Sequence, residues 1–208
     1  MTTWLAVALI IGAYILGSIS FAVLVSKAMG LPNPYSYGSG NPGATNVLRT
    51  GNKKAAILTL LGDALKGFVA VMIAKSLILH QDTWQWVIAC VAFSVFLGHV
   101  FPIFHRFKGG KGVATAAGVL FGIHWILGLA ALSTWLIIAF FFRYSSLAAL
   151  TTAIFAPLYA YFLFFTNKTV HQDVCIAVLA IGVLLIWRHQ SNIQQLMNGS
   201  EGKIGQKK

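Results

Sequence analysis

Long apolar runs constrain this chain more than any other feature of its sequence. Runs of about 18 or more apolar residues predict membrane-spanning helices, because the hydrocarbon core of a bilayer needs roughly 20 helical residues to cross. Clear runs of this kind cover residues 3–26, 55–79, 84–104, 146–165 and 173–188. The chain is 58% hydrophobic and only 9% charged, whereas soluble domains carry about 25% charged residues. We therefore predict an all-α polytopic membrane protein.

A further apolar run, at 113–142, is too long for one ordinary span. Charge decides how it is divided, because Lys and Arg gather on the cytoplasmic side of membrane proteins. One long helix would place Arg143 and the basic tail outside, whereas two helices with a turn near His124 place both inside. We predict seven transmembrane helices, with the N-terminus outside and the C-terminus cytoplasmic. They form a single domain over 1–208 that ends in a short basic cytoplasmic tail at about 190–208.

The connections between the predicted spans differ strongly between the two sides of the membrane. The segments expected outside, at 80–83 and 166–172, are short and plain, while the cytoplasmic segments hold most of the unusual residues. Fifteen Lys and Arg face four Asp and Glu, which gives a formal charge of +11. Such an excess suits anionic lipids or anionic substrates. Function is therefore expected at the cytoplasmic face of the membrane.

The stretch GSGNPGATN at 38–46 begins with a match to the G-x-G-x-x-G fingerprint of dinucleotide-binding domains. The fingerprint needs a strand before it and a helix after it, but here a membrane helix and a Pro-containing loop precede it. An anion-binding loop is at least as good an interpretation as a merely flexible loop, because glycines present N–H groups without obstruction by Cβ. Arg49 adds a planar fork suited to phosphate. The candidate phosphate-binding residues are Gly40, Asn41, Gly43, Thr45 and Asn46.

A second glycine-rich stretch, GHVFPIFHRFKGGKGVAT, covers residues 98–115. Its Lys111 is surrounded by three glycines, which are Gly109, Gly110 and Gly112. The helix predicted to begin near Val113 would offer free N–H groups and a partial positive charge at its N-terminus. Phosphate binding is therefore favoured over a basic anchor at the lipid headgroups. His99 is either a further ligand contact or a packed residue at the membrane interface.

Asp63 and Lys66 are charged residues within the predicted span at 55–79. Each costs roughly 2.5–3.5 kcal/mol at a helix centre, and residues three apart share one helix face. Pairing lowers this cost, and such residues normally face the interior of a helix bundle. A structural ion pair is the favoured interpretation, and a contribution to the functional site is the alternative.

Two polar segments lie at the cytoplasmic ends of later spans. RYSS places Ser145 and Ser146 at the start of a span, where serine is either a helix N-cap or a headgroup contact. The tail begins RHQSNIQQLMNGSE, in which His189 and Asn192 lie three residues apart on a predicted short helix. Both side chains can therefore point into one site, and histidine can act there as acid, base or phosphate partner.

The sequence points to neither a metal nor a cofactor. Cys90 and Cys175 are isolated within apolar runs, so they indicate no metal site and no disulfide framework. Four acidic residues provide no carboxylate pair for acid–base catalysis, and no G-x-S-x-G nucleophile motif is present. The pattern suits transfer between anionic substrates, with positioning and charge stabilisation supplying most of the catalysis.

Three segments resemble the signature segments of the bacterial acyl-phosphate:glycerol-3-phosphate acyltransferases, the PlsY family. They are GSGNPGATN with Arg49, GHxFPxFxxFKGGKGVAT, and RHxxN followed by Glu201. The resemblance implies an enzyme of the bacterial inner membrane that transfers a fatty acyl group from acyl phosphate to the 1-hydroxyl of glycerol 3-phosphate, the first acylation of phospholipid synthesis. Its partners would be the two substrates and membrane lipids, with no cofactor and no nucleic acid. The oligomeric state stays open.

The resemblance also implies roles for individual residues. The glycine loop around Lys111 matches a phosphate-binding loop linked with glycerol 3-phosphate, and Glu201 matches a residue tied to structural integrity. A serine of RYSS is also implicated, and we prefer Ser146 to Ser145. The catalytic set implied in this way comprises Ser39, Arg49, Lys111, Ser146, His189 and Asn192.

Two other classes of protein compete with an enzyme. A transporter for an organic anion would line its path with Asp63 and Lys66, but such proteins often contain two repeated halves, and the sequence shows no convincing repeat. A membrane protein that binds phosphate headgroups without catalysis is the third possibility. Product formation from glycerol 3-phosphate separates the enzyme from both.

Overall fold

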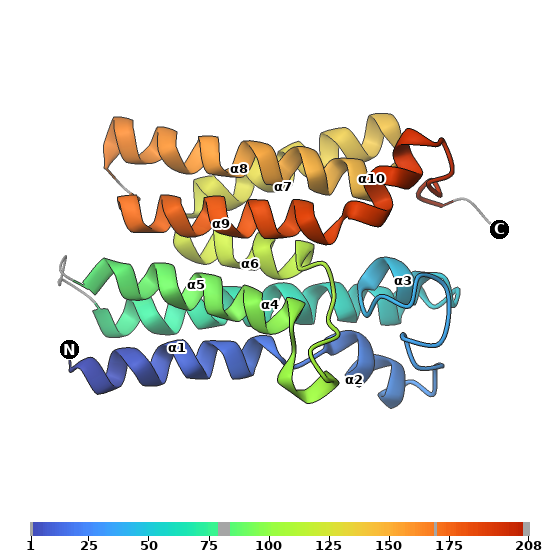
Figure 1. Cartoon of the computed structure of the whole chain (residues 1–208), viewed down its shortest axis with the longest axis horizontal. Helices are drawn as coiled ribbons and strands as arrows, with labels where there is room; N and C mark the ends of the chain where they lie inside the picture. Colours follow the sequence, from blue (N-terminus) through green and yellow to red (C-terminus); the bar gives the residue numbers. More distant parts are fainter. Residues whose placement is uncertain (1, 79–83, 169, 206–208) are drawn as a thin grey trace.

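The computed structural model describes residues 2–78, 84–168 and 170–205, and every regular element within them is a helix. The helices run mostly along one long axis, with the N-terminus at one end of the molecule and the C-terminal segment at the other (Figure 1). The all-α prediction is therefore confirmed. The predicted connection at 80–83 and the end of the basic tail, at 206–208, lie outside the described residues.

Ten α-helices and a short 3-10 helix follow one another along the described chain. They are α1 (Thr3–Gly17), α2 (Phe21–Ala28), α3 (Ala44–Leu48), α4 (Lys53–Ile78), α5 (Gln85–Val100), η2 (Ile103–His105), α6 (Val113–Ile123), α7 (Trp125–Phe142), α8 (Ser145–Asn167), α9 (Gln172–Arg188) and α10 (Gln190–Met197).

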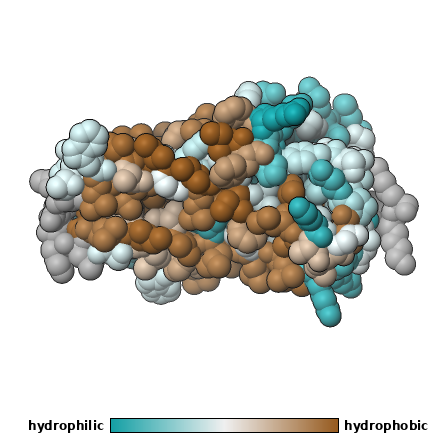
Figure 2. Space-filling model, turned by 90° about the horizontal axis from the view of Figure 1, so that it is seen from below, coloured by the Kyte–Doolittle hydropathy of each residue, from teal (hydrophilic) through white to brown (hydrophobic). Residues whose placement is uncertain are grey.

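Membrane-spanning length is reached by 4 helices of the described chain: α4, α5 with its continuation to His105, α7 and α8. The pairs α1–α2 and α9–α10 are also long and apolar enough if each bent pair counts as one span, which raises the number to 6. Their bends are 45° and 57°. Helix α6 is shorter, with 11 residues. Figure 2 shows an apolar surface over the middle of the molecule and a hydrophilic end.

The long apolar run at 113–142 is divided at His124, as predicted. Helix α6 ends at Ile123, and α7 begins at Trp125 after the single residue His124, whose Nδ1 accepts a hydrogen bond from the N–H of Ile126 at 3.3 Å. Lys75 of α4 donates to the carbonyls of Gly122 and Ile123 at 3.1 and 2.9 Å. These contacts satisfy backbone groups that a helix end leaves without partners.

The first apolar run, predicted at 3–26, contains a break that its hydropathy does not reveal. The Ser18 hydroxyl donates to the carbonyl of Tyr14 at 2.9 Å, and the Ser20 hydroxyl accepts from the N–H of Val23 at 3.4 Å, which caps α2. Serine side chains compete in this way with the backbone hydrogen bonds of a helix. The break frees the carbonyls of Gly17 and Ile19, and the Lys66 ammonium binds both.

Close helix packing brings this break next to α5. Helix α1 packs on α5, and α4 packs on α6. A Cβ at Gly17 would overlap the backbone of Val95, and a Cβ at Gly98 would overlap the carbonyl of Tyr14. Small residues allow backbones to approach in this way where helices pack inside a membrane. The broken α1–α2 segment therefore lies directly beside the end of α5 that carries His99.

The polar connections gather at one end of the helix bundle. The α2–α3 loop, the glycine loop before α6, helix α10 and the C-terminal segment all lie near the end that carries the C-terminus (Figure 1). Hydrophilic residues concentrate at the same end of the surface in Figure 2. The tertiary structure thus brings together segments that are far apart in the sequence, and the candidate site is built from them.

Candidate active site

The first loop, between α2 and α3, is organised by Asn46. Its side chain is only 2% exposed and donates to the carbonyls of Pro34 and Tyr37 at 2.8 and 3.2 Å. Its Oδ1 accepts from the N–H of Ser39 at 3.0 Å. These bonds engage the donors and the acceptor of the amide with the loop's own backbone. The sequence predicted a phosphate contact here, whereas the structure uses Asn46 to hold the loop in shape.

Other polar residues of this first loop face outward. Gly38 and Gly40 have φ angles of +57° and +64°, a left-handed region that glycine enters without strain. Asn46 Oδ1 occupies the space that a Cβ at Gly38 would need, and the Arg49 side chain passes close by. Arg49 and Ser39 are both exposed. The structure therefore brings this predicted pair to the same surface, where both remain accessible to a ligand. Of the other predicted loop residues, Thr45 is exposed and Gly40, Asn41 and Gly43 are partly exposed.

Helix α5 carries the glycine loop on its C-terminal end. The N–H of Gly110 donates to the carbonyl of His99 at 3.2 Å. A Cβ at Gly109 would overlap that same carbonyl, and a Cβ at Gly112 would overlap the ring of Phe96. Gly112 also has a φ of +88°. These glycines are therefore required by close packing on α5, a reason that the sequence alone did not indicate.

The two loops touch each other. The Tyr35 hydroxyl of the first loop donates to the carbonyl of Lys108 at 2.7 Å. A Cβ at Gly110 would lie 3.0 Å from the carbonyl oxygen of Pro42. The first two segments identified in the sequence thus form one continuous surface at the polar end.

A chain of hydrogen bonds joins the glycine loop to the C-terminal segment. Lys111 donates to Oδ1 of Asn192, and the amide of Asn192 donates to both carboxylate oxygens of Glu201 at 3.0 and 3.1 Å. The Ser146 hydroxyl donates to Glu201 at 2.7 Å. Four residues singled out in the sequence therefore meet in one network. Ser146 is 4% exposed and directly bonded to this network, and no such bond to Glu201 is described for Ser145.

His189 lies between α9 and α10, next to this network, and is 2% exposed. Its Nδ1 lies 2.8 Å from the carbonyl oxygen of Leu185. Because a carbonyl oxygen only accepts, Nδ1 must carry the hydrogen, and in the neutral ring Nε2 is then the atom with a free lone pair. The local structure thus sets the tautomer of His189.

Arg188 is a site residue that was not among those predicted from the sequence. One of its Nη atoms donates to the carbonyl of Gly109 at 3.0 Å and lies 3.5 Å from that of Gly110. Its guanidinium also lies 5.9 Å from the centre of the Phe101 ring. Arg188 therefore ties α9 to the glycine loop. The sequence signal that could have indicated Arg188 is its position immediately before His189.

The charges at this end are unbalanced. Burial lowers the pKa of the Lys111 ammonium below its usual value; nearby Glu201 opposes this shift, and the positive charges of Arg188 and Arg49 add to it. Two further cations thus act on Lys111, with a single carboxylate among the groups that act on it. Such a cluster favours a ligand that brings negative charge.

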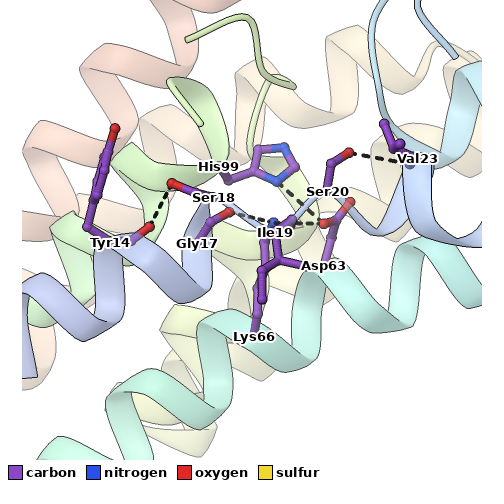
Figure 3. A network of polar contacts seen from close by, with 9 residues as sticks. All are labelled: Tyr14, Gly17, Ser18, Ile19, Ser20, Val23, Asp63, Lys66 and His99. Atoms are coloured by element: carbon purple, nitrogen blue, oxygen red, sulfur yellow. Dashed lines mark hydrogen bonds and ion pairs between the residues drawn. The ribbon is translucent and has the colours of Figure 1, made fainter. Parts of the chain in front are cut away.

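Below the glycine loop, a buried cluster connects α1, α4 and α5 (Figure 3). The Lys66 ammonium lies 2.9 Å from Oδ1 of Asp63 and donates to the carbonyls of Gly17 and Ile19 at 2.9 and 2.6 Å. Nδ1 of His99 lies 3.5 Å from the same Asp63 oxygen. The two charged residues of the span do pair, and the pair also holds the helix break in place.

No group of three or more His, Cys, Asp or Glu side chains that could hold a metal ion occurs within the described residues. The arrangement instead offers cations, backbone N–H groups, one buried histidine and one carboxylate network, which together suit the binding of phosphate groups.

Comparisons with known proteins agree with this picture. Residues 7–199 match the family model described as glycerol-3-phosphate acyltransferase. A Burkholderia ambifaria protein named glycerol-3-phosphate acyltransferase is 63% identical over 196 residues, which cover 94% of this chain and 89% of the relative. A Burkholderia pseudomallei protein of the same name is 61% identical over 198 residues, which cover 95% of each chain.

Solved structures are similar over almost the whole chain. A crystal structure of PlsY (YgiH), described as an integral membrane glycerol 3-phosphate acyltransferase in its glycerol 3-phosphate form, matches with a TM-score of 0.86 and 40% identity. The match covers 96% of both chains. The lysophosphatidic acid form of PlsY matches with a TM-score of 0.85, also at 40% identity.

Proposed function

This chain belongs to the glycerol-3-phosphate acyltransferase family of integral membrane proteins, and we propose that its acyl donor is acyl phosphate. The reaction transfers the fatty acyl group to the 1-hydroxyl of glycerol 3-phosphate. A new ester bond forms at the carbonyl carbon, the bond from that carbon to the phosphate oxygen breaks, and inorganic phosphate leaves. The product is lysophosphatidic acid.

The observation that carries this proposal is the excess of cations at the glycine loop. Arg49 and Arg188 both lie close enough to Lys111 to act on its charge, while Glu201 is the carboxylate acting on Lys111. Both proposed substrates carry a phosphate group, and acyl phosphate also releases one. A site with surplus positive charge stabilises the charge that moves onto the leaving phosphate.

We assign the two phosphates to neighbouring parts of this cluster. The headgroup of acyl phosphate lies among Ser39, Arg49 and Lys111, and its acyl chain extends between helices. The phosphate of glycerol 3-phosphate binds at the glycine loop before α6, where Arg188 holds the loop carbonyls. Those carbonyls then point away from the ligand, and the loop N–H groups other than that of Gly110, which donates to the His99 carbonyl, are left for phosphate.

The acceptor hydroxyl attacks the acyl carbonyl directly, without an acyl-enzyme intermediate. Nε2 of His189 carries a free lone pair in the neutral ring, because Nδ1 donates to Leu185. It accepts or orients the hydroxyl proton, and the leaving phosphate is the final proton acceptor. Asn192 and Ser146 hold Lys111 and Glu201 in place through the hydrogen-bond network. Trapping of an acylated serine would contradict direct transfer.

We further propose that the chain lies in the bacterial inner membrane with seven spans, counting the short α6 as one. The N-terminus then lies outside, and the loops that carry the site lie in the cytoplasm among anionic lipids. In Figure 1 the two termini lie at opposite ends of the molecule, which supports an odd number of membrane crossings. A cysteine introduced at position 124 should react with a membrane-impermeant reagent only from the outer side, and labelling from the cytoplasm would overturn the seven-span arrangement.

An anion transporter is disfavoured by the contacts of Lys66. An ammonium group has three N–H donors, and Lys66 directs its ammonium to Asp63, Gly17 and Ile19. A residue that lines a transport path must instead keep donors free for the passing ion. The charged residues within the span therefore serve the helix bundle.

One assay tests the proposed function. Purified protein in lipid nanodiscs receives radiolabelled glycerol 3-phosphate with either acyl phosphate or acyl-CoA. We expect labelled lysophosphatidic acid with acyl phosphate and none with acyl-CoA. Product with acyl-CoA alone would contradict the proposed donor, and absence of product with both would favour binding or transport.

A further inference from the structure

His99 occupies a position between the buried ion pair and the glycine loop. It is 8% exposed, and its Nδ1 lies 3.5 Å from the Asp63 carboxylate. Its Nε2 lies where a Cβ at Gly110 would have to go. The two ring nitrogens therefore face protein groups on opposite sides. Figure 3 shows the ring above Asp63, at the end of the cluster formed with Lys66 and the α1–α2 break.

We propose that His99 is a positioning residue that sets the place of the glycine loop for binding glycerol 3-phosphate, with Asp63 orienting its imidazole. This inference rests on the proposed function, because it assigns the phosphate of glycerol 3-phosphate to that loop. The sequence left open whether His99 contacts the ligand or packs at the interface. The geometry points to a support beneath the loop that does not touch the substrate.

The contacts with the loop come from both the backbone and the ring of His99. Its carbonyl accepts from the N–H of Gly110 at 3.2 Å, while its imidazole fills the space beside the same glycine. The ring thus determines how closely Gly110 can pack against the end of α5. The N–H groups of residues 109–112 keep their positions only if this support keeps its shape.

The orientation of the ring depends on Asp63, which is itself held by Lys66. Asp63 Oδ1 is 2.9 Å from the Lys66 ammonium and faces Nδ1 of His99. Lys66 in turn binds the carbonyls released at the α1–α2 break. A fixed carboxylate facing Nδ1 limits rotation of the imidazole about its side-chain bonds, in the same way that outer partners orient histidine ligands.

Arg188 supports the loop from another element. It donates to the carbonyl of Gly109 and lies near that of Gly110, whereas His99 lies against Gly110 from α5. Arg188 therefore fixes the carbonyls of the loop, and His99 fixes how closely Gly110 packs on the end of α5. Removing His99 should loosen the loop without removing a group that reacts, so substrate binding should weaken more than turnover.

The first test compares His99→Gln and His99→Asn with His171→Ala. Gln places an amide near the position of Nε2, and Asn places one near Nδ1. His171, before α9 at the opposite end of the bundle, controls for loss of a histidine as such. We measure the Kd of radiolabelled glycerol 3-phosphate in nanodiscs, together with KM and kcat. For His99→Asn, which leaves Gly110 unsupported, we expect Kd and KM to rise about tenfold, and kcat to fall about twofold at most.

The conservative variant distinguishes positioning from mere stability. His99→Gln should recover most of the affinity, because it again fills the space beside Gly110. His171→Ala should leave Kd and KM at the wild-type values. Equal Kd values for His99→Asn and the wild type would overturn the proposal, and so would a large fall in kcat with KM unchanged, since that pattern belongs to a group acting in the transition state.

A double variant tests the contact itself. Gly110→Ala introduces a methyl group into the space of the imidazole and should raise the KM for glycerol 3-phosphate strongly. In the double variant His99→Ala with Gly110→Ala, the methyl group has room, so the double loss should be smaller than the product of the single losses. Losses that multiply would show that the two residues act independently and would overturn the proposal.

The binding measurement separates this inference from the proposed function. If the wild type binds glycerol 3-phosphate but makes no product from acyl phosphate, the proposed donor fails while the Kd values still decide the role of His99. If the wild type is active and all His99 variants keep its Kd and KM, only the positioning role fails.

Discussion

Two charged clusters lie close together in this molecule and differ in how their charges are satisfied. The buried cluster of Asp63, Lys66 and His99 neutralises itself, since Lys66 binds one carboxylate and two backbone carbonyls. The cluster at the glycine loop brings three cations near one carboxylate, Glu201. The difference separates structure from function: charges that the protein satisfies hold helices together, and charges that it leaves in excess attract a ligand.

The same contrast explains why Lys66 and Lys111 have different roles. The Lys66 side chain is only 1% exposed, and its ammonium is held by Asp63 and the two carbonyls. Lys111 is only partly buried and donates to the neutral amide of Asn192. Its charge is therefore only partly compensated. Substitution of Lys66 should therefore mainly reduce stability, and substitution of Lys111 should mainly reduce activity.

The largest effect is expected for Lys66→Met, which leaves Asp63 without its main partner and two carbonyls unbound. Breaking a buried ion pair from one side costs about 3–5 kcal/mol. We expect a lower free energy of unfolding by about this amount, measured by denaturation in detergent. The double variant Asp63→Asn with Lys66→Met should be more stable than Lys66→Met alone. A double variant that is less stable would contradict the structural role of the pair.

Lys111→Ala should show the opposite pattern, with a large loss of activity at nearly unchanged stability. Removing one group that stabilises transition-state charge typically costs about 10²–10³-fold in kcat. We expect a fall of this size in kcat/KM for glycerol 3-phosphate. Lys108→Ala is the matched control, because Lys108 is exposed on the same loop. Full turnover by Lys111→Ala would falsify the electrostatic role of this residue.

Ser146→Ala should have an intermediate effect, since it removes the hydroxyl that donates to Glu201 at 2.7 Å. Hydrogen bonds to charged groups contribute about 1.5–3 kcal/mol. We expect a destabilisation of this order, with reduced activity because Glu201 also holds Asn192. Ser145→Ala, one residue earlier at the start of α8, should change stability by less than about 0.5 kcal/mol. Equal effects of both substitutions would argue against the network.

The pH dependence should report the charge of Lys111. Its pKa is lowered mainly by burial, and the charged form predominates below that pKa. Binding of acyl phosphate, whose headgroup we place at Lys111, should therefore weaken as the pH rises through the lowered value, before a free lysine would lose its charge. In Lys111→Arg, the guanidinium stays charged, so this alkaline loss should move to higher pH. Measuring the Kd of the wild type and of Lys111→Arg from neutral to alkaline pH checks both expectations. Superimposable pH profiles for the two proteins would exclude Lys111 as the titrating group.

The smallest effect is expected for Lys75→Met, far from both clusters. Lys75 donates to the carbonyls at the end of α6, and its loss should reduce stability by about 1 kcal/mol. Both kcat and KM should stay unchanged. A clear loss of affinity for glycerol 3-phosphate would mean that the α6–α7 break communicates with the glycine loop, and the separation of the two ends would then fail.

Hydropathy and charge along the chain were sufficient to predict the helical membrane fold, the division of the run at 113–142 and the polar end of the molecule. These properties are local: an apolar run of the right length forms a helix in a membrane whatever surrounds it. The segments of the site were also visible, because glycines beside cations and a His-x-x-Asn pair are unusual among apolar residues.

Only the tertiary structure decided which of these residues hold the protein together and which remain for a ligand. The break at Ser18–Ser20 depends on Lys66, which lies on another helix. The loop-holding role of Asn46 and the support that Arg188 gives to the glycine loop depend on backbone carbonyls, which no side-chain pattern reveals. Whether a polar group is satisfied is a matter of distances between segments far apart in the sequence, and those distances exist only after the helices have packed.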